Sequence, residues 1–467
     1  MNKYFKLAEN QTSIKQELLA ALTTFFTMAY IIFVNPAILS KTGMDFNAVL
    51  LATCISAGVG TLVMGLLANY PFAQAPGMGL NAYFTFTVVL GMGYTWQQAL
   101  AAVFISGVLF IILTFTGLRK AIVDAIPLSI RLAIPAGIGA FIALIGFNNA
   151  GIIRFNQGPI IDIILGAEQL DKDAMIGQVL TAPPQVLEFG DFSDPAVMLA
   201  IFGFALLSVL MILRINAALF LGIVITVLVG IPLGVTQMPE SYTLSNFDLS
   251  PTFLQLDFAG LLYSANGEFS AFELLLNIAT VVISFTLVDL FDTIGTLLGT
   301  AAKGGFLDKN GKLPRMNRAL TADAIATTTG ALLGTSSVTT YIESGSGIVA
   351  GGKTGLTAVF VAVFFFLSIL LAPFAGIVPA AATAPALIMV GVLMFGSLKK
   401  INFEDLEEAI PAFLIIMVMP FSYSIANGIA AGLIFYTLIK LAKGKAKEVH
   451  PIVYIITLLF IIRFAIV

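Results

Sequence analysis

The chain has almost none of the residues that build disulfide frameworks, zinc sites or histidine proton relays. Its 467 residues include one cysteine, Cys54, and one histidine, His450. A single cysteine excludes an intramolecular disulfide, and His450 lies outside every long apolar segment. We therefore expect no metal site, no cofactor and no proton transfer through histidine.

Charge is scarce as well. Charged residues make up 10% of the chain and its formal net charge is -3, whereas about a quarter of an ordinary soluble domain is charged. Hydrophobic residues reach 58%, which predicts an all-α polytopic membrane protein. No basic run resembles a nucleic-acid patch, so we expect no nucleic-acid partner. The lysines between 440 and 447 are instead expected to meet lipid headgroups.

Apolar segments long enough to cross a bilayer, roughly 17 to 25 residues, recur along the whole chain. Together with shorter apolar pieces they predict fourteen helices. The long segments are 18–38, 47–69, 97–117, 130–147, 196–213, 217–235, 273–299, 318–334, 355–374, 378–397 and 424–441, and the shorter ones are 76–90, 341–352 and 409–421. A last stretch, 451–467, is short and carries Arg463, so it is either an extra span or a helix on the membrane surface.

The basic residues give the chain an orientation, because lysine and arginine accumulate in cytoplasmic loops. With the N-terminus inside, only Lys41, Arg154 and Lys172 of the loop residues fall outside. The acidic segments 151–195 and 236–271 then become external loops. We predict a multi-pass protein of the cell membrane with a cytoplasmic N-terminus, and no removable signal peptide.

Two short, glycine-containing apolar segments occupy corresponding places in the two halves of the chain, Asn69–Phe86 and Thr335–Gly352. The spans before them, Phe25–Pro36 and Ser284–Gly295, correspond too. Paired, interrupted segments of this kind point to a transporter site at a repeat interface. Seven spans in each half would enter the membrane with opposite orientation, so we predict inverted repeats of seven helices.

Four acidic residues lie within or beside these segments, where a charge costs roughly 2.5–3.5 kcal/mol. Glu343 sits in the glycine-rich break, and Asp289 and Asp292 are three residues apart on one helix face. Asp323 lies on a helix of small residues. We favour a functional role for Glu343 and Asp292. For Asp289 and Asp323, a structural hydrogen-bonding role is as well supported as a functional one.

The glycine clusters around the breaks do not indicate nucleotide chemistry. Neither is followed by a Walker lysine or a strand and helix of Rossmann type. Asn81 is equally suited to cap a helix or to touch a ligand. No pairing of nucleophile and base is evident, so we do not expect an enzyme.

Five longer motifs carry a resemblance to a known family. FFTMAYIIFVNP, APGMGLNAYF, VDLFDTIGTLLG, TADAIATTTGALLGTSSVTTYIES and PFSYSIANGI are similar to the guanine/hypoxanthine/adenine permeases, a branch of the nucleobase-cation symporters that also includes xanthine and uracil permeases. The resemblance runs through both halves of the chain.

This resemblance implies a transporter of seven plus seven inverted helices with a core domain, a gate domain and two half-helices preceded by short strands. The strands would be Tyr70–Ala75 and Ser336–Tyr341, paired between the repeats. The core domain would comprise 1–125 and 271–376, and the gate domain 126–270 and 377–467 with the C-terminal tail. The gate domain is the part that dimerises in the family, so a homodimer is expected.

The resemblance also implies roles for individual residues. Asp292 and Glu343 match the family's substrate-contacting acids, and Asn81 matches the polar position of the first break. We assign Ser344 and Gly345, which open the second half-helix, to the same substrate site. Proton coupling is assigned to Asp292, with Asp289 and Asp323 in support. The uracil branch has a histidine where this chain has Thr296, which favours the purine branch.

Carboxylates suit a purine substrate, because guanine and hypoxanthine offer a ring N1–H donor. Adenine lacks that donor and ranks behind them. We expect proton symport, with sodium less favoured, driving import by an elevator-like movement. The alternative is an anion transporter or channel of the related sulfate-permease fold. It is disfavoured because no lysine or arginine accompanies the acids at the breaks in the sequence.

Overall fold

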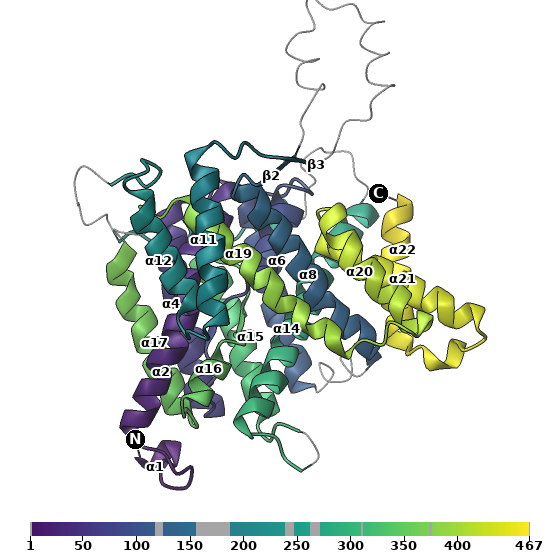
Figure 1. The fold of residues 1–467 in the computed structure, drawn as a ribbon. Helices are drawn as coiled ribbons and strands as arrows, with labels where there is room; N and C mark the ends of the chain where they lie inside the picture. The colour runs from purple at the N-terminus through teal and green to yellow at the C-terminus, as the bar shows by residue number, and fades with distance from the viewer. Residues whose placement is uncertain are drawn as a thin grey trace, which may run out of the picture.

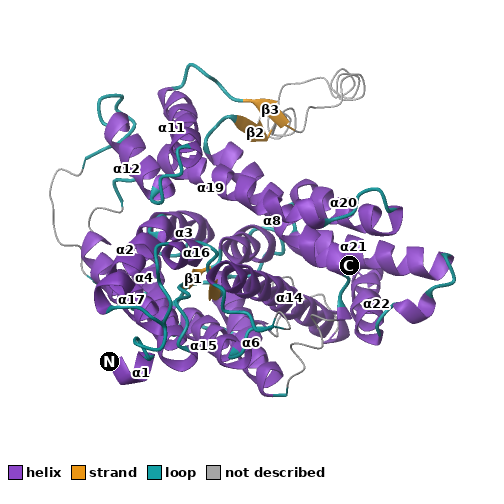
Figure 2. Ribbon diagram, turned by 60° about the horizontal axis from the view of Figure 1, so that its bottom comes forward, coloured by secondary structure: helices purple, strands orange, loops and turns teal. Residues whose placement is uncertain are grey.

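The computed structural model describes residues 2–116, 125–155, 187–238, 247–261, 271–309, 312–372 and 376–466. Within this part the chain is a bundle of membrane-length helices around two short strands (Figures 1 and 2). Eight of the described helices are long and apolar enough to cross a membrane. Shorter apolar helices, among them 78–89 and 218–230, complete the bundle.

Every predicted segment of the first half overlaps a helix. Polar caps begin several of them: Ser13, Asp45 and Thr95 each accept a hydrogen bond from a backbone N–H of the first turn. The elements are α1 (Asn2–Phe5), α2 (Ile14–Met28), α3 (Ile31–Leu39), η1 (Ser40–Thr42), α4 (Phe46–Val63), η2 (Met64–Ala68), β1 (Gln74–Pro76), α5 (Met78–Ala82), η3 (Tyr83–Val89), α6 (Trp96–Phe115), α8 (Leu128–Asn149), β2 (Ile153–Phe155), β3 (Leu187–Phe189), α11 (Pro195–Ile212) and α12 (Ala218–Gly230).

The second half repeats this order. After α13 (Phe258–Leu261), the elements are α14 (Ala271–Gly304), α15 (Met316–Leu333), β4 (Val338–Thr340), α16 (Ser344–Val349), α17 (Gly355–Ser368), η4 (Ile369–Leu371), α19 (Ala380–Met394), η5 (Phe395–Lys400), α20 (Leu406–Phe421), α21 (Ile425–Ala442), η6 (Ala446–Glu448) and α22 (Pro451–Ile466). The predicted loop 151–195 holds β2 and β3, which pair antiparallel. Parts of both predicted external loops, 156–186, 239–246 and 262–270, lie outside the described residues.

The two predicted strands exist and pair, but they are shorter than expected, and β1 ends at Pro76, one residue past the predicted end. β1 and β4 run antiparallel with Ala75 opposite Thr339. Two further backbone bonds extend the pairing, from Gly77 N to Ser337 O at 2.9 Å and from Tyr341 N to Ala73 O at 3.0 Å. An antiparallel pair of equal strands has a local twofold axis at its centre, which is the axis expected for inverted repeats.

Helix contacts follow the same symmetry. α4 of the first half packs against α17 of the second, and the equivalent pair is α15 of the second half against α6 of the first. Likewise α11 packs on α12 and α19, while α20 packs on α21 and α8. The helices at the centre of these groups, α8 and α19, pack on each other. The chain is therefore an inverted-repeat membrane protein of seven plus seven segments, as the sequence predicted.

The C-terminal stretch, for which the sequence left two possibilities, forms α22 and packs antiparallel along α21. Thr457 lies 3.2 Å from Thr437 near the middle, and Arg463 Nη1 donates to Asn427 Oδ1 at 3.5 Å near the start of α21. α22 also contacts α14. In Figure 1 the chain ends at the face of the bundle opposite the N-terminus. This packing favours the extra span over a surface helix.

The packing of α22 makes a topological prediction. Cysteines introduced at Glu9 and at Lys447, both exposed, should be labelled from one side of the membrane. A cysteine at Ala465 should be labelled from the other, because an antiparallel neighbour of a spanning helix must itself span. Membrane-impermeant maleimide on oriented vesicles measures this, and the native Cys54 is buried and gives little background. Labelling of all three positions from the same side would show that α22 does not cross.

Candidate functional site

Glu343 lies where β4 leads into α16, at the middle of the bundle. The helix that follows is only 344–349 long, and Gly351 with φ +106° lies beyond its end. The Tyr30 hydroxyl, buried at the junction of α2 and α3, donates to Glu343 Oε1 at 2.9 Å. A residue of the first repeat therefore orients the acid of the second, while the Glu343 side chain remains partly exposed.

Asp292 approaches the same region from α14. Its Oδ2 is 3.7 Å from the position that a Cβ on Gly77 would occupy, so it lies at the start of α5. Glu343 and Asp323 are close enough to Asp292 to interact with it electrostatically. Within the described part of the chain, no hydrogen bond holds the partly exposed Asp292 carboxylate. Its acceptor oxygens are available to a ligand.

Asn81 is fully buried on α5, and its Oδ1 accepts a hydrogen bond from the Ser336 hydroxyl just before β4. Among the described residues its Nδ2 has no partner. A buried amide without a partner costs about 1–3 kcal/mol. Asn81 does not cap α5, because Gly77 holds the cap position and makes no side-chain cap bond. Its side chain is tied to Ser336 and keeps an unpaired donor, and a substrate contact stays a prediction.

Ser344 and Gly345 are engaged differently from what their assignment to the substrate implied. The Ser344 hydroxyl accepts from Ala73 N at 2.9 Å. The amides of Ser344 and Gly345 donate to the Tyr341 and Ile342 carbonyls. These groups support the strand and turn behind Glu343, and a substrate contact by either residue stays a prediction.

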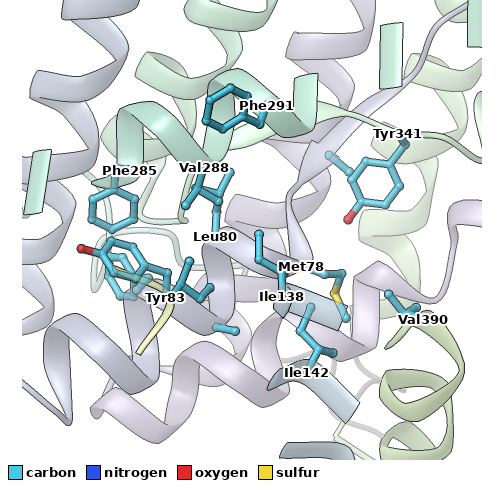
Figure 3. Packing of buried hydrophobic residues seen from close by; sticks show 14 of the residues in the cluster. Met78, Leu80, Tyr83, Ile138, Ile142, Phe285, Val288, Phe291, Tyr341 and Val390 are labelled. Atoms are coloured by element: carbon cyan, nitrogen blue, oxygen red, sulfur yellow. The ribbon is translucent and has the colours of Figure 1, made fainter. Parts of the chain in front are cut away.

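Apolar side chains form a wall beside the start of α5, where Asp292 approaches. Figure 3 shows Met78 and Leu80 of α5 facing Ile138 and Ile142 of α8. The Tyr341 hydroxyl donates to Pro76 O at 2.5 Å, which fixes its ring beside this wall. Further apolar side chains in the same view are Val288, Phe291 and Val390. Flat, apolar surfaces next to a few directed acceptors are typical of sites for small planar ligands.

Asp289 and Asp323 lie behind the strands, and both are fully buried. The Thr293 hydroxyl is 2.9 Å from Asp323 Oδ1, 3.3 Å from Asp289 Oδ1 and 2.7 Å from Thr339 Oγ1. Thr339 therefore donates to Thr293, which donates to Asp323. Thr327 donates to Asp289 Oδ2 at 3.4 Å. The two acids tie α14 and α15 to the strand pair, and their part in proton coupling stays a prediction.

Lys303 corrects one step of the sequence argument. We expected no lysine or arginine beside the acids of the breaks, yet Lys303 reaches Gly345. A Cβ on Gly345 would lie 3.6 Å from Lys303 Nζ. Lys303 interacts electrostatically with Glu343. Because Lys303 and Glu343 are separated by many residues and belong to different elements, no local pattern could have paired them.

Tyr30 and Thr293 were also missed. Tyr30 stands in an apolar run where an aromatic residue ordinarily packs in the core. Thr293 directly follows Asp292 and lies one helical turn after Asp289, and this position was its only signal in the sequence.

The fold and the site together define a membrane transport protein. Irregular backbone at membrane depth occurs where it lines a substrate pathway, and acids at such breaks mark the site.

Comparison with known proteins identifies the family. The model of the Permease family matches residues 15–168 and 160–431. The chain belongs to this family, and it is a transporter rather than an enzyme.

Relatives match over nearly the whole chain. A permease of Methanocaldococcus jannaschii is 47% identical over 99% of this chain and 98% of the relative. The guanine/hypoxanthine permease PbuO of Bacillus subtilis is 44% identical, over 98% and 99%. The adenine permease AdeP of Escherichia coli is 41% identical, over 99% and 95%. The resemblance drawn from the five motifs is confirmed.

Solved structures share the fold at low identity. The transmembrane domain of the cyanobacterial bicarbonate transporter BicA superposes with a TM-score of 0.61 at 15% identity, covering 90% of this chain and 97% of that domain. SLC26A9 gives 0.60 at 12% identity, over 93% and 67%. These matches establish the architecture and carry no information about substrate.

The network around Thr293 makes a stability prediction. Thr293→Val keeps the shape but removes the hydroxyl, so it should lower the free energy of unfolding by about 1–3 kcal/mol. The matched control is Thr300→Val on the same helix, where the buried hydroxyl donates to its own helix at Thr296 O, 2.6 Å away. Thermal unfolding in detergent should show a lower midpoint for Thr293→Val than for Thr300→Val. Equal midpoints for the two variants would show that the Thr293 hydroxyl network does not stabilise the fold.

Proposed function

We propose that the protein imports purine nucleobases, with guanine and hypoxanthine preferred over adenine. The observation that carries this is the pair of partly exposed carboxylates, Glu343 and Asp292, beside an apolar wall at the meeting point of the two half-helices. Asp292 holds no hydrogen bond among the described residues. The site therefore offers acceptors to a flat ligand that carries donors.

Purine chemistry fits these acceptors. Guanine and hypoxanthine present a ring N1–H, and guanine adds an adjacent amino group, so a carboxylate can accept paired bonds. Aromatic and aliphatic side chains can stack on the ring. Adenine lacks the N1–H and needs a protonated carboxyl group or another pose. The names of PbuO and AdeP, a guanine/hypoxanthine and an adenine permease, support purines as the class.

Movement is proposed to be elevator-like, with a core domain (1–125 and 271–376) sliding against a gate domain (126–270 and 377–467). The helix contacts support this division, since the most extensive ones join α8 to α19 and α20 on one side and α4 and α6 to α15 and α17 on the other. Where the two groups meet, Gly79 lies against Ile138: a Cβ there would come within 2.7 Å of Ile138 Cγ2. A glycine against an aliphatic side chain permits sliding.

Coupling to protons is proposed through Asp292, because a partly buried carboxyl group close to other acids, here Asp323 and Glu343, binds a proton more readily than one in water. Asp289 and Asp323 support it through the strand network, and sodium is the less favoured ion. A protonated Asp292 donates a hydrogen bond to the base. When Asp292 ionises on the inside of the membrane, the base and the proton are both released.

We place the N-terminus in the cytoplasm of a cell-membrane protein, and the resemblance suggests a homodimer through the gate domain.

The alternative is an anion transporter or channel of the related sulfate-permease fold, and BicA and SLC26A9 share only their architecture with this chain. The charge at the site weighs against it. Even with Lys303 counted, Glu343 and Asp292 leave a net negative site when ionised, which repels an anion.

Glu343→Gln tests the substrate. Replacing the charged acceptor should weaken guanine or hypoxanthine binding by about 1.5–3 kcal/mol, roughly tenfold to a hundredfold. Binding to purified protein measures this, with the exposed Glu404→Gln as a control that leaves affinity unchanged. Unaltered affinity in the folded Glu343→Gln protein would remove Glu343 from the site. Uptake of sulfate but not of hypoxanthine by the parent would favour the anion alternative.

Asp292→Asn tests the coupling. The amide mimics a permanently protonated carboxyl group, so the variant should exchange purine across the membrane but fail to accumulate it against a gradient. Proteoliposomes with an imposed inward proton gradient provide the measurement. Accumulation by the variant at the parent's level, or a parent that responds to sodium and not to pH, would show that Asp292 does not carry the coupling proton.

A further inference from the structure

Lys303 lies on the face of α14 that also carries Asp292. The two residues are eleven positions apart, about three helical turns, which returns the side chain to the same face roughly 16 Å further along. Gly295 and Gly299 lie between them, and a Cβ on either would meet no atom within 4 Å. The exposed Lys303 side chain therefore has room to move along this face.

The ammonium group of Lys303 is directed at the start of the second half-helix. The Gly345 Cβ position is 3.4 Å from Lys303 Cδ and 3.6 Å from Lys303 Nζ, both ordinary van der Waals distances. Glu343, two residues before Gly345, interacts electrostatically with Lys303. No direct ion pair joins them in the described structure, and Glu343 Oε1 is held by Tyr30 instead. Lys303 therefore lies near Glu343 but does not form an ion pair with it.

The transport cycle explains why a nearby but unpaired cation is useful. In the loaded state the donors of the base satisfy Glu343. After release the core must return empty, and an ionised carboxylate without a partner is costly within the bilayer. The other ionisable groups facing Glu343 are Tyr30, Tyr341 and Asp292. Of this set with Lys303, only the lysine supplies a positive charge.

We propose that Lys303 is the counter-cation of Glu343 in the empty carrier: it moves along the glycine face of α14 onto the acid once the base has left, and it allows the unloaded core to return. The proposal rests on the proposed function, since it requires a substrate that occupies Glu343. It assigns Lys303 a positioning role in the return step and no contact with the bound base.

The test separates return of the loaded carrier from return of the empty one. Exchange of external for internal purine needs only loaded movements, whereas net uptake needs the empty return. Lys303→Gln in proteoliposomes should keep hypoxanthine exchange within about twofold of the parent and lose net uptake at least tenfold. Lys303→Arg should retain net uptake. Lys309→Gln, an exposed lysine on the following loop, is the matched control and should retain both.

Acidification supplies a second readout that a structural defect would not produce. A proton on Glu343 replaces the missing positive charge, so net uptake by Lys303→Gln should recover as the pH falls, relative to the parent at each pH. Asp292 is present in both proteins, so the ratio isolates the lysine.

Three results would overturn the proposal: net uptake by Lys303→Gln at the parent's level, loss of exchange together with net uptake, or a defect that acid does not reduce. Absence of purine exchange in the parent is a different result, because it would refute the proposed function itself.

Discussion

The pairing of β1 with β4 is the interaction on which the rest of the structure depends. Inside a bilayer every backbone N–H and C=O needs an internal partner, so a chain can leave helical geometry only where another segment completes its hydrogen bonds. Each strand does this for the other across the twofold axis. Two half-helices can therefore begin at mid-depth, and their starting residues can face a substrate pathway rather than lipid.

The same constraint explains why so many polar side chains lie within an apolar protein. Thr293, Thr339 and Asp323 connect the strand pair to α14 and α15, and the Asn81–Ser336 contact does so from α5. Buried polar networks are costly when incomplete and rigid when complete. This network holds the strands in place, so Glu343 and Asp292 can remain short of partners without loss of the local structure.

Features that depend on residues close together in the sequence could be predicted, whereas contacts between residues far apart in the sequence could not. Span positions and the two breaks depend on hydropathy and glycine content, which are local, and both were predicted. Glu343 was singled out because a charge in an apolar segment is visible in the sequence itself. The contacts of Tyr30 and Lys303 with the Glu343 region were not predictable, because they join separate helices and resemble ordinary core and loop residues. Strand lengths were overestimated because the flanking residues pair through single bonds.

The helix α22 has a consequence for the balance between conformations. A carrier made of two inverted halves has two end states that interchange when the halves exchange roles, and perfectly matched halves would make those states equal in energy. Among the described helices, none follows α12 as α22 follows α21. α22 contacts both α14 and α21. No described helix of the first half makes the equivalent contacts. The contacts of α22 therefore distinguish two halves that are otherwise related by the inverted repeat.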